Sequence, residues 1–457
     1  VFLTGLRTDD PYYQQLQTTE LPTVLWDMRI RNPLVHCVSS DSTEGMRLAT
    51  EYLIQLGHRR IGLILGHMLA QVSLQRRDGY ILALANAGIS LDPELMPFPG
   101  RQYPARKPLF GVFADASPDR WGRVLMNKRE RLRAEKESRK PRKLYDSDYL
   151  IGVYDETRMG GLRFKEDPEG PFLSDDRDAA IPPWARLRTL EEAARNYEND
   201  ESGLTEKWLE QLVRPGSSLG GARPKATVVD EKGGLWIAKF PSKHDENDIG
   251  AWEKVVHDLA GLCGLHVPEA RLEKFSRYGS TYLVRRFDRD GSKRIHYASA
   301  MTLLGRTDGA SAEDGVSYLD IASFIKSHGA NPKADLKELW KRIVFNMTVS
   351  NTDDHLRNHA FLLTQRGWSL SPMFDVNPES AGNELSLNVD ETDNRIRIEL
   401  AISVAERFGI SKKEAEDIAR SIGKTVTDRW KYLAKSCGLS RGQIEAMAPA
   451  FSANLAR

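Results

Sequence analysis

The hydrophobic positions of the first 92 residues follow two periods in alternation. The short apolar runs TVLWD, 23–27, and IGLIL, 61–65, have the length of buried strands. Over 42–56 and 75–87 apolar residues recur three or four positions apart, and a glycine follows each stretch, as at many helix C-termini. Strand, helix, strand, helix predicts a parallel sheet with right-handed crossovers.

This pattern stops at DPELMPFPGRQYP, 92–104, whose prolines and glycine predict a boundary between domains. A strongly charged helix is expected next, over 126–143, within which KRERLRAEKESRKPRK interleaves glutamates with basic residues. Opposite charges four positions apart pair along a helix. We therefore interpret this helix as a solvated face rather than as a nucleic-acid contact.

From residue 214 the pattern predicts a β-rich segment. RPGSSLGGARPKATVV passes from a glycine-rich turn into a strand, DEKGG makes a hairpin, and LWIAKF is the second strand. The period of two puts Lys239 on one face with Leu235 and Ile237. An ammonium group among apolar residues needs a partner, and the helix 249–262 offers Glu253. The alternative is that Lys239 reaches solvent along the sheet.

The glycine-rich turn before the first strand is a candidate phosphate-binding loop. Gly220 and Gly221 would let the backbone approach a phosphate chain and point N–H groups at it, and Lys225 would add positive charge. Most glycine-rich turns are only turns, so this motif alone is weak evidence.

A polar loop, NTDDHLRN, follows the apolar helix 336–351. Asp353 and Asn358 are five positions apart, the spacing of the base and the magnesium-binding asparagine in the protein-kinase catalytic loop. The hairpin AFLL-TQRG-WSL then returns the chain to Asp375, which we expect close to Asn358. Two hard oxygen ligands suit Mg²⁺. The chain therefore carries, in this order, a glycine-rich loop, a strand lysine, a helix glutamate, an Asp–Asn loop and a second aspartate. Together these are the parts of a phosphoryl-transfer site.

Composition narrows the alternatives. The 457 residues are 40% hydrophobic and 28% charged with a net charge of +1, which predicts two or three domains and no general polyanion-binding surface. No apolar run approaches the roughly 20 residues of a membrane span, and the first residues lack a signal-peptide layout. Three scattered cysteines form no disulfide or zinc pattern. We expect a cytoplasmic protein.

The first 92 residues, with LGHRRIGLI and RRDGYILALANAGI, resemble part of the effector domain of the LacI-type regulator family. The resemblance implies a partial periplasmic-binding-protein-like α/β segment, and in that family an arginine at the position of Arg76 often contacts the effector. One alternative function is therefore a fragment of a sugar-sensing transcriptional regulator. We expect no effector binding, because one lobe cannot enclose a ligand.

From about residue 98 the chain resembles the HipA family, the serine/threonine kinases of bacterial type II toxin–antitoxin modules. The resemblance rests on SSLGGARPKATVV, LWIAKF, YLVRRFDR, NTDDHLRNHAFLL and LSPMFDVNP. It implies an α+β bilobal protein-kinase-like fold with a largely helical C-terminal lobe, and ATP and Mg²⁺ as cofactors. Asp353 would be the catalytic base, Asn358 and Asp375 the metal ligands, and Lys239 the contact to the α and β phosphates.

The same resemblance carries finer expectations. Ser218 matches a serine that such kinases phosphorylate on themselves, and a dianion there would repel the ATP phosphates. His355 matches a histidine that approaches the phosphates. We read Asp354 as solvated, and we expect no metal on the His355–His359 pair. The family implies an aminoacyl-tRNA synthetase as substrate and a HipB-like DNA-binding antitoxin as partner, with no membrane contact and no direct nucleic-acid binding without the antitoxin.

The resulting domain prediction has four parts. Residues 1–92 form the LacI-like segment, 93–200 an incomplete HipA-like N-terminal subdomain, 201–290 the kinase N-lobe, and 291–457 the helical C-lobe. A second alternative to an active kinase is a catalytically inactive kinase-like scaffold.

Overall fold

The structure, a computed structural model, describes residues 2–4, 11–27, 30, 32–58, 61, 63, 71–89, 109–167, 169–173, 181–199, 212 and 223–452. The chain divides into two compact units, 1–102 with 365–367, and 103–364 with 368–457. The predicted boundary at 92–104 lies outside the described residues. Across the described part, no helix has both the length and the apolar character to cross a membrane.

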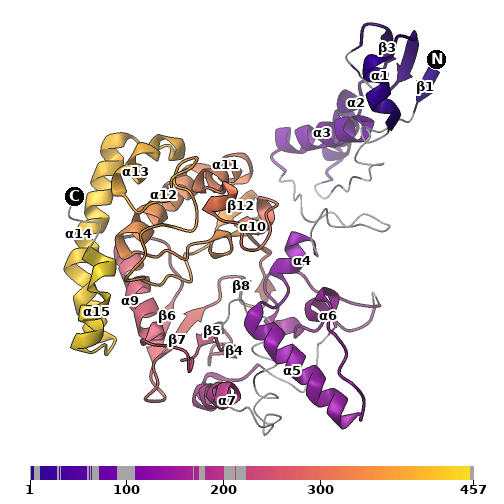
Figure 1. Ribbon diagram of the computed structural model, residues 1–457. Helices are drawn as coiled ribbons and strands as arrows, with labels where there is room; N and C mark the ends of the chain where they lie inside the picture. The colour runs from indigo at the N-terminus through magenta and orange to yellow at the C-terminus, as the bar shows by residue number, and fades with distance from the viewer. Residues whose placement is uncertain are drawn as a thin grey trace. The chain divides into compact units, whose positions relative to one another are not determined.

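In its described residues, the first unit contains a parallel sheet of order β1-β2-β3 and the helices α1, α2 and α3 (Figure 1). Its elements are β1 (Phe2–Thr4), α1 (Pro11–Thr18), β2 (Thr23–Trp26), β3 (Val35–Val38), α2 (Ser42–Gln55) and α3 (Gln71–Asn86). Helices α2 and α3 approach so closely that a Cβ on Gly79 would lie 2.0 Å from the carbonyl oxygen of Thr43. The predicted parallel α/β pattern is confirmed, although most of the strand expected at 61–65 lies outside the described residues.

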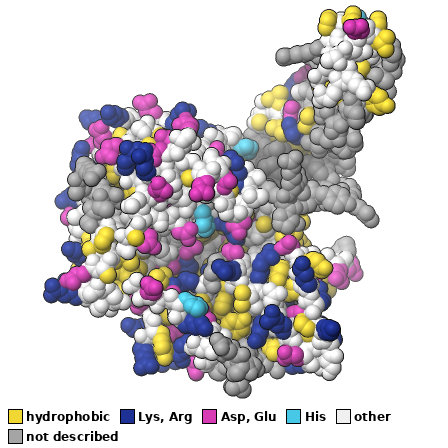
Figure 2. Space-filling view, in the orientation of Figure 1, with side chains coloured by type: hydrophobic (Ala, Val, Ile, Leu, Met, Phe, Trp, Pro, Cys, Tyr) yellow, Lys and Arg dark blue, Asp and Glu magenta, His cyan; other side chains and the backbone are white. Residues whose placement is uncertain are grey.

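A helical region opens the second unit. It comprises α4 (Gly111–Asp115), α5 (Arg120–Lys136), α6 (Asp146–Ile151), η1 (Asp155–Thr157), η2 (Trp184–Arg186) and α7 (Leu187–Asn199). Figure 2 shows Lys and Arg side chains gathered over the α5 region. The pairing expected between residues four positions apart is present in Arg133 and Glu137, whose Nε and Oε1 lie 2.8 Å apart. Arg139, beyond the end of the helix, also pairs with Glu130, with Nη1 2.6 Å from Oε1.

The predicted bounds of this charged helix, 126–143, were wrong by six or seven residues. Asp119 starts α5 earlier by accepting a hydrogen bond from the N–H of Arg120 at 2.9 Å. Trp121 and Leu125 then bury the apolar face of its first turns. The chain leaves the helix at Ser138, whose φ of 50° is incompatible with a continuing right-handed helix.

An antiparallel sheet of order β4-β5-β7-β6 forms the smaller lobe. Its strands are β4 (Lys225–Val229), β5 (Leu235–Lys239), β6 (Ala270–Glu273) and β7 (Thr281–Arg285), and α9 (Ile249–Leu262) follows β5. Trp236 and Ala238 are buried on the face that packs against α5 and α7. Because side chains alternate along a strand, Ile237 and Lys239 lie on the opposite face and line a cavity.

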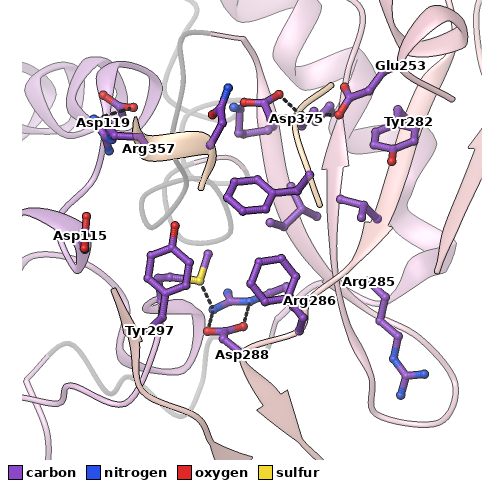
Figure 3. Close-up of a pocket in the computed structure, with 18 of the residues that line it drawn as sticks. Asp115, Asp119, Glu253, Tyr282, Arg285, Arg286, Asp288, Tyr297, Arg357 and Asp375 are labelled. Carbon is purple, nitrogen blue, oxygen red and sulfur yellow. Dashed lines mark hydrogen bonds and ion pairs between the residues drawn. The ribbon is translucent and has the colours of Figure 1, made fainter. Parts of the chain in front are cut away.

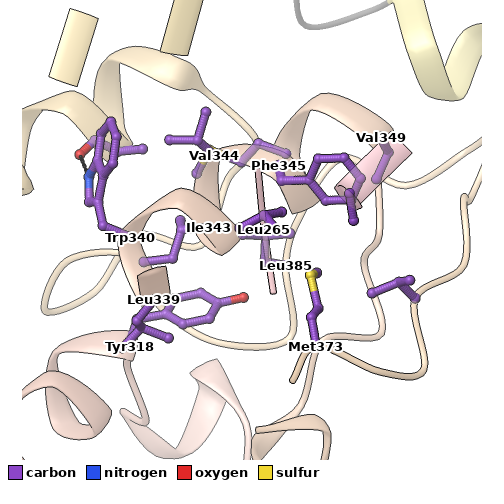
Figure 4. Close-up of a cluster of buried hydrophobic side chains, with 14 of the residues drawn as sticks. Leu265, Tyr318, Leu339, Trp340, Ile343, Val344, Phe345, Val349, Met373 and Leu385 are labelled. Atoms are coloured by element: carbon purple, nitrogen blue, oxygen red, sulfur yellow. Dashed lines mark hydrogen bonds between the residues drawn. The ribbon is translucent and has the colours of Figure 1, made fainter. Parts of the chain in front are cut away.

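The larger lobe is mainly helical and surrounds α12, with Trp340, Val344 and Phe345 at its centre (Figure 4). The indole N–H of Trp340 donates to the carbonyl of Ala401 at 2.8 Å. The elements are β8 (Arg289–Asp290), β9 (Lys293–Arg294), β10 (Tyr297–Ser299), α10 (Ala300–Leu303), η3 (Ala312–Asp314), α11 (Tyr318–His328), α12 (Pro332–Val349), η4 (Leu356–Asn358), β11 (Ala360–Thr364), β12 (Gly367–Leu370), α13 (Ile398–Ser403), η5 (Ala405–Phe408), α14 (Lys412–Ser436) and α15 (Arg441–Ser452).

The two lobes of the second unit confirm the predicted α+β bilobal fold. Helix α9 has the bounds that periodicity predicts, and its apolar residues belong to the core of the larger lobe. Helix α12 starts at Pro332, four residues earlier than expected, because proline is well suited to the first turn of a helix.

Candidate functional site

One cavity of about 320 Å³ lies between the sheet, the start of the helical lobe and the helices α4 and α5 (Figure 3). Six of the predicted site residues line it, contributed by segments far apart in the sequence: Lys225, Lys239, Glu253, His355, Asn358 and Asp375. The predicted base Asp353 is not among the residues that line it. Ser218, Gly220 and Gly221 lie outside the described residues.

Two lysines meet on the cavity face of the sheet. Lys225 and Lys239 are direct partners in the antiparallel register of β4 and β5, so both side chains project from the same face. Burial, together with the smaller effect of repulsion by Lys239, lowers the pKa of Lys225 to about 8. Like charges facing each other across strands are unfavourable, so this face is suited to an anion.

Lys239 has two carboxylate partners. Its Nζ lies 2.6 Å from Oε1 of Glu253, the predicted ion pair, and 2.5 Å from Oδ1 of Asp375. Burial would lower the pKa of Lys239, but the two carboxylates outweigh it and the pKa is raised. Asp248 starts α9 by accepting the N–H of Ala251 at 3.1 Å, which fixes the helix that carries Glu253.

The loop after α12 presents the candidate base. Ser350 ends the helix in a left-handed conformation with φ of 51°, and the chain then turns toward the cavity. Asp353 is exposed, and the amide Nδ2 of Asn358 donates to its backbone carbonyl at 2.8 Å. Partial desolvation raises the pKa of Asp353, although nearby His355 opposes this shift. An exposed carboxylate on an anchored loop can accept a proton from a hydroxyl group.

Asp375 arrives beside this loop as the hairpin predicts. Strands β11 and β12 are hydrogen-bonded neighbours, and they return the chain so that Asp375 and Asn358 line the same cavity. Asp375 has a φ of 58°, an uncommon conformation that is often found at functional sites. The charge of Lys239 lowers the pKa of Asp375, so its carboxylate is ionised at neutral pH.

The oxygens of Asn358 and Asp375 fit a magnesium ion better than a transition metal. Among the described residues, no three His, Cys, Asp or Glu side chains gather into an all-protein metal site. Magnesium takes one or two protein oxygens and completes its shell with water and phosphate. The carboxylate of Asp375 and the amide of Asn358 on the wall of this cavity match that requirement.

The prediction that Asp354 is solvated was wrong. Its side chain is buried and accepts hydrogen bonds from Tyr318, Asn346 and His359. Burial would raise its pKa, but His359 and the donors lower it. Alternation of exposed and buried positions does not apply in an irregular loop, so no local pattern indicated that this carboxylate turns inward.

The cavity also has residues to which sequence reasoning assigned no role. Asp115 and Asp119 come from α4 and the start of α5, and Arg357 comes from η4. Arg357 Nη1 lies 3.2 Å from Oδ2 of Asp119, and Asp115 accepts the N–H of Ser299 at 2.7 Å. Both aspartates lie in the stretch GVFADASPDRWGR, 111–123, and two carboxylates so close together were the available signal.

A deeper side of the cavity is formed where β7 ends. Arg286 and Asp288 form a buried ion pair at 2.6 Å, and the N–H of Gly160 donates to Asp288 at 2.8 Å. Phe287 and Phe374 also line the cavity, and their ring centroids lie 5.4 Å apart. This side joins the two lobes and offers aromatic surface next to polar backbone.

Comparison with known proteins adds two family matches. Residues 217–430 match the HipA-like C-terminal domain, and residues 1–107 match the periplasmic binding proteins and sugar binding domain of the LacI family. A putative kinase of Haemophilus influenzae is 29% identical over 179 residues, 35% of this chain and 52% of that protein. The HTH-type transcriptional regulator AglR of Rhizobium meliloti is 37% identical over 97 residues, 21% of this chain and 27% of the regulator.

Shewanella oneidensis supplies a relative and a solved structure. Its serine/threonine-protein kinase toxin HipA is 25% identical over 228 residues, 43% of this chain and 51% of the toxin. The complex of its toxin–antitoxin system HipA and HipB with operator DNA matches with a TM-score of 0.52 at 19% identity, over 71% of this chain and 80% of that chain. This likeness supports the fold. The chain spans about half the length of these kinase relatives and about a quarter of the regulator.

Proposed function

Residues 217–430 belong to the HipA-like C-terminal domain family, and from that premise we propose that the protein is an ATP-dependent serine/threonine protein kinase. The observation that carries the proposal is the convergence of Lys225, Lys239, Asn358 and Asp375 on one cavity. The two facing lysines would bind the phosphates of a nucleoside triphosphate, and the side-chain oxygens of Asn358 and Asp375 would bind its magnesium ion. Asp353, on the same loop as Asn358, is the proposed catalytic base.

The proposed roles follow from charge and position. Lys239, held by Glu253, binds the α and β phosphates, and Lys225 adds a second positive charge on the same face of the sheet. Asp353 accepts the proton of the substrate hydroxyl as its oxygen bonds to the γ-phosphorus, and the bond from that phosphorus to the β–γ bridging oxygen breaks so that ADP leaves. Asn358 and Asp375 would hold magnesium, which when bound neutralises charge on the phosphate oxygens.

Finer parts of the proposal rest on the family resemblance. We propose Ser218 as the autophosphorylation site, an aminoacyl-tRNA synthetase as substrate class, and a HipB-like antitoxin as partner. The match to a solved complex of HipA with HipB and operator DNA supports the partner proposal. Cys37, Cys263 and Cys437 are free thiols, which is consistent with a reducing cytoplasm as the proposed location.

A radiolabel transfer assay tests the kinase proposal. Full-length chain with Mg²⁺ and ATP labelled in the γ-phosphate should label itself on Ser218. Asp353→Asn should lower the initial rate by about 10²–10⁴-fold, the range for losing a general base. Asp417→Asn, a change to an exposed carboxylate on α14, is the matched control and should keep the wild-type rate. Well-folded wild-type protein that transfers no label would favour the inactive scaffold.

A second candidate concerns residues 1–107 alone. Their match to the sugar binding domain of the LacI family supports a fragment of a sugar-responsive regulator. Arg76, the candidate effector contact, is exposed on α3. Scanning calorimetry with a panel of sugars tests this candidate, because a sugar that binds the first unit would shift its unfolding transition.

A further inference from the structure

A buried polar cluster, which we define as Tyr318, Asn346, Asp354 and His359, lies behind the candidate catalytic loop. Three donors converge on Oδ2 of Asp354: the Tyr318 hydroxyl at 2.7 Å, the Asn346 amide at 2.6 Å and the His359 Nε2 at 2.8 Å. The proposed chemistry uses none of these four side chains. Asp354 is only 2% exposed, so the whole arrangement is shielded from solvent.

The cluster continues into the segment that carries Asp375. The Oδ1 of Asn346 accepts the Nδ2 of Asn351 at 3.1 Å, and the Oδ1 of Asn351 accepts the backbone N–H of Asn377 at 3.1 Å. One unbroken series of hydrogen bonds therefore runs from α12 through the first residue of the catalytic loop to the chain just beyond Asp375. Connected buried hydrogen bonds of this kind give a local structure one defined geometry.

The cluster holds the proposed functional residues through their neighbours. Asp354 follows Asp353 directly, and His359 follows Asn358 directly. The supporting side chains Tyr318 and Asn346 project from α11 and α12, both packed into the core of the larger lobe. A loop fixed at both ends to rigid helices keeps its exposed side chains in a constant orientation.

The energetic cost of the cluster argues that it does more than fill space. A buried carboxylate is expensive unless it is paired and hydrogen-bonded, and the ion pair of Asp354 is with His359 rather than with a permanently charged arginine or lysine. Replacing such a group with apolar residues is often neutral or stabilising. What apolar residues would not provide is directional bonding on both sides of Asp353 and Asn358.

We propose that Asp354 is a positioning residue that, through Tyr318, Asn346 and His359, holds Asp353 and Asn358 in the geometry required for phosphoryl transfer. The inference rests on the proposed kinase function. Weakening the cluster lowers kcat, because small misplacements of reacting groups slow the chemical step. It leaves the KM for ATP nearly unchanged, because Lys225 and Lys239 stand on the sheet, outside the cluster.

Two variants of the full chain test the positioning role. Tyr318→Phe removes one hydroxyl and keeps the ring, and we expect kcat to fall about tenfold, as for loss of one hydrogen bond to a charged group. Asp354→Asn places an amide against the Asn346 amide, whose oxygen is already bonded to Asn351. We expect about a 100-fold loss in kcat, the scale for residues that orient a functional group. The KM for ATP should stay within about twofold.

Thr348→Val is the matched control. Thr348 is buried on α12 and its hydroxyl donates to the carbonyl of Val344 at 2.7 Å, so the variant also loses one buried hydroxyl outside the cluster. Its kcat should equal that of the wild type. Folded Tyr318→Phe and Asp354→Asn proteins with wild-type kcat, or with a raised KM alone, would overturn the inference.

Hydrogen exchange separates this inference from the kinase proposal. If the wild type transfers no phosphate, the proposed function fails, and exchange of the amides of residues 351–359 decides the positioning role. Faster exchange there in Asp354→Asn, with α12 unchanged, supports it. Equal exchange in the variant and the wild type contradicts it whatever the activity.

Discussion

At the scale of single residues, the lysine pair on the sheet predicts how the proposed ATP binding depends on pH. Lys225 has a pKa of about 8 because it is buried and faces Lys239, whereas the carboxylates keep Lys239 charged to higher pH. Below pH 8 both lysines are positive in the free protein. Above pH 8 Lys225 is neutral, so binding a phosphate there requires uptake of a proton.

We therefore predict that ATP affinity falls with rising pH above about 8, by up to about tenfold per pH unit. Titration calorimetry between pH 7 and 9.5 measures this. In Lys225→Arg the guanidinium stays charged, and the affinity should be constant over that range. A wild-type affinity that does not change with pH would mean that Lys225 makes no phosphate contact.

At the scale of elements, the position of α9 depends on Gly250, because a residue with a side chain would not fit there. A Cβ on Gly250 would lie 2.2 Å from the backbone carbonyl oxygen of Ser280, so the first turn of the helix packs directly on the start of β7. This contact sets the helix that presents Glu253 to Lys239. A displacement of α9 therefore reaches the cavity.

Gly250→Ala should destabilise the protein by about 1–3 kcal/mol, the cost of overpacking, and weaken ATP binding. Gly261→Ala on the same helix is the control, because its Cβ would meet the nearest atom, on Val267, at an ordinary 3.4 Å. It should stabilise by about 0.4–1 kcal/mol. Equilibrium unfolding in guanidinium chloride measures both, and equal stabilities would contradict the packing argument.

At the scale of the whole molecule, the chain has two compact units. We predict at least two transitions in scanning calorimetry of the full chain, because separate cores unfold separately. ATP with Mg²⁺ at 100 times its Kd should stabilise one transition by about 2.7 kcal/mol and leave the other unchanged. A shift of the second transition by a sugar would support the regulator fragment, and a single transition would contradict independent units.

The parts of the candidate site that depend on residues close together in the sequence were predictable. The spacing of Asp353 and Asn358 and the hairpin to Asp375 each specify a local geometry, and the strand period assigns Lys239 to a face. These features depend on neighbours only a few residues away, so the sequence contains them. The same local signals predicted α9 to the residue and a parallel sheet in the first unit, although they did not predict its strand β3.

Other features depended on contacts between distant segments. The sequence by itself determined which residues are candidates for binding phosphate and magnesium and which elements carry them. Only the tertiary structure decided that Asp354 is buried against Tyr318, that Asp119 meets Arg357, and that Lys225 faces Lys239. The reason is physical: burial and pKa depend on which elements pack together, and no local pattern in an irregular loop records that packing.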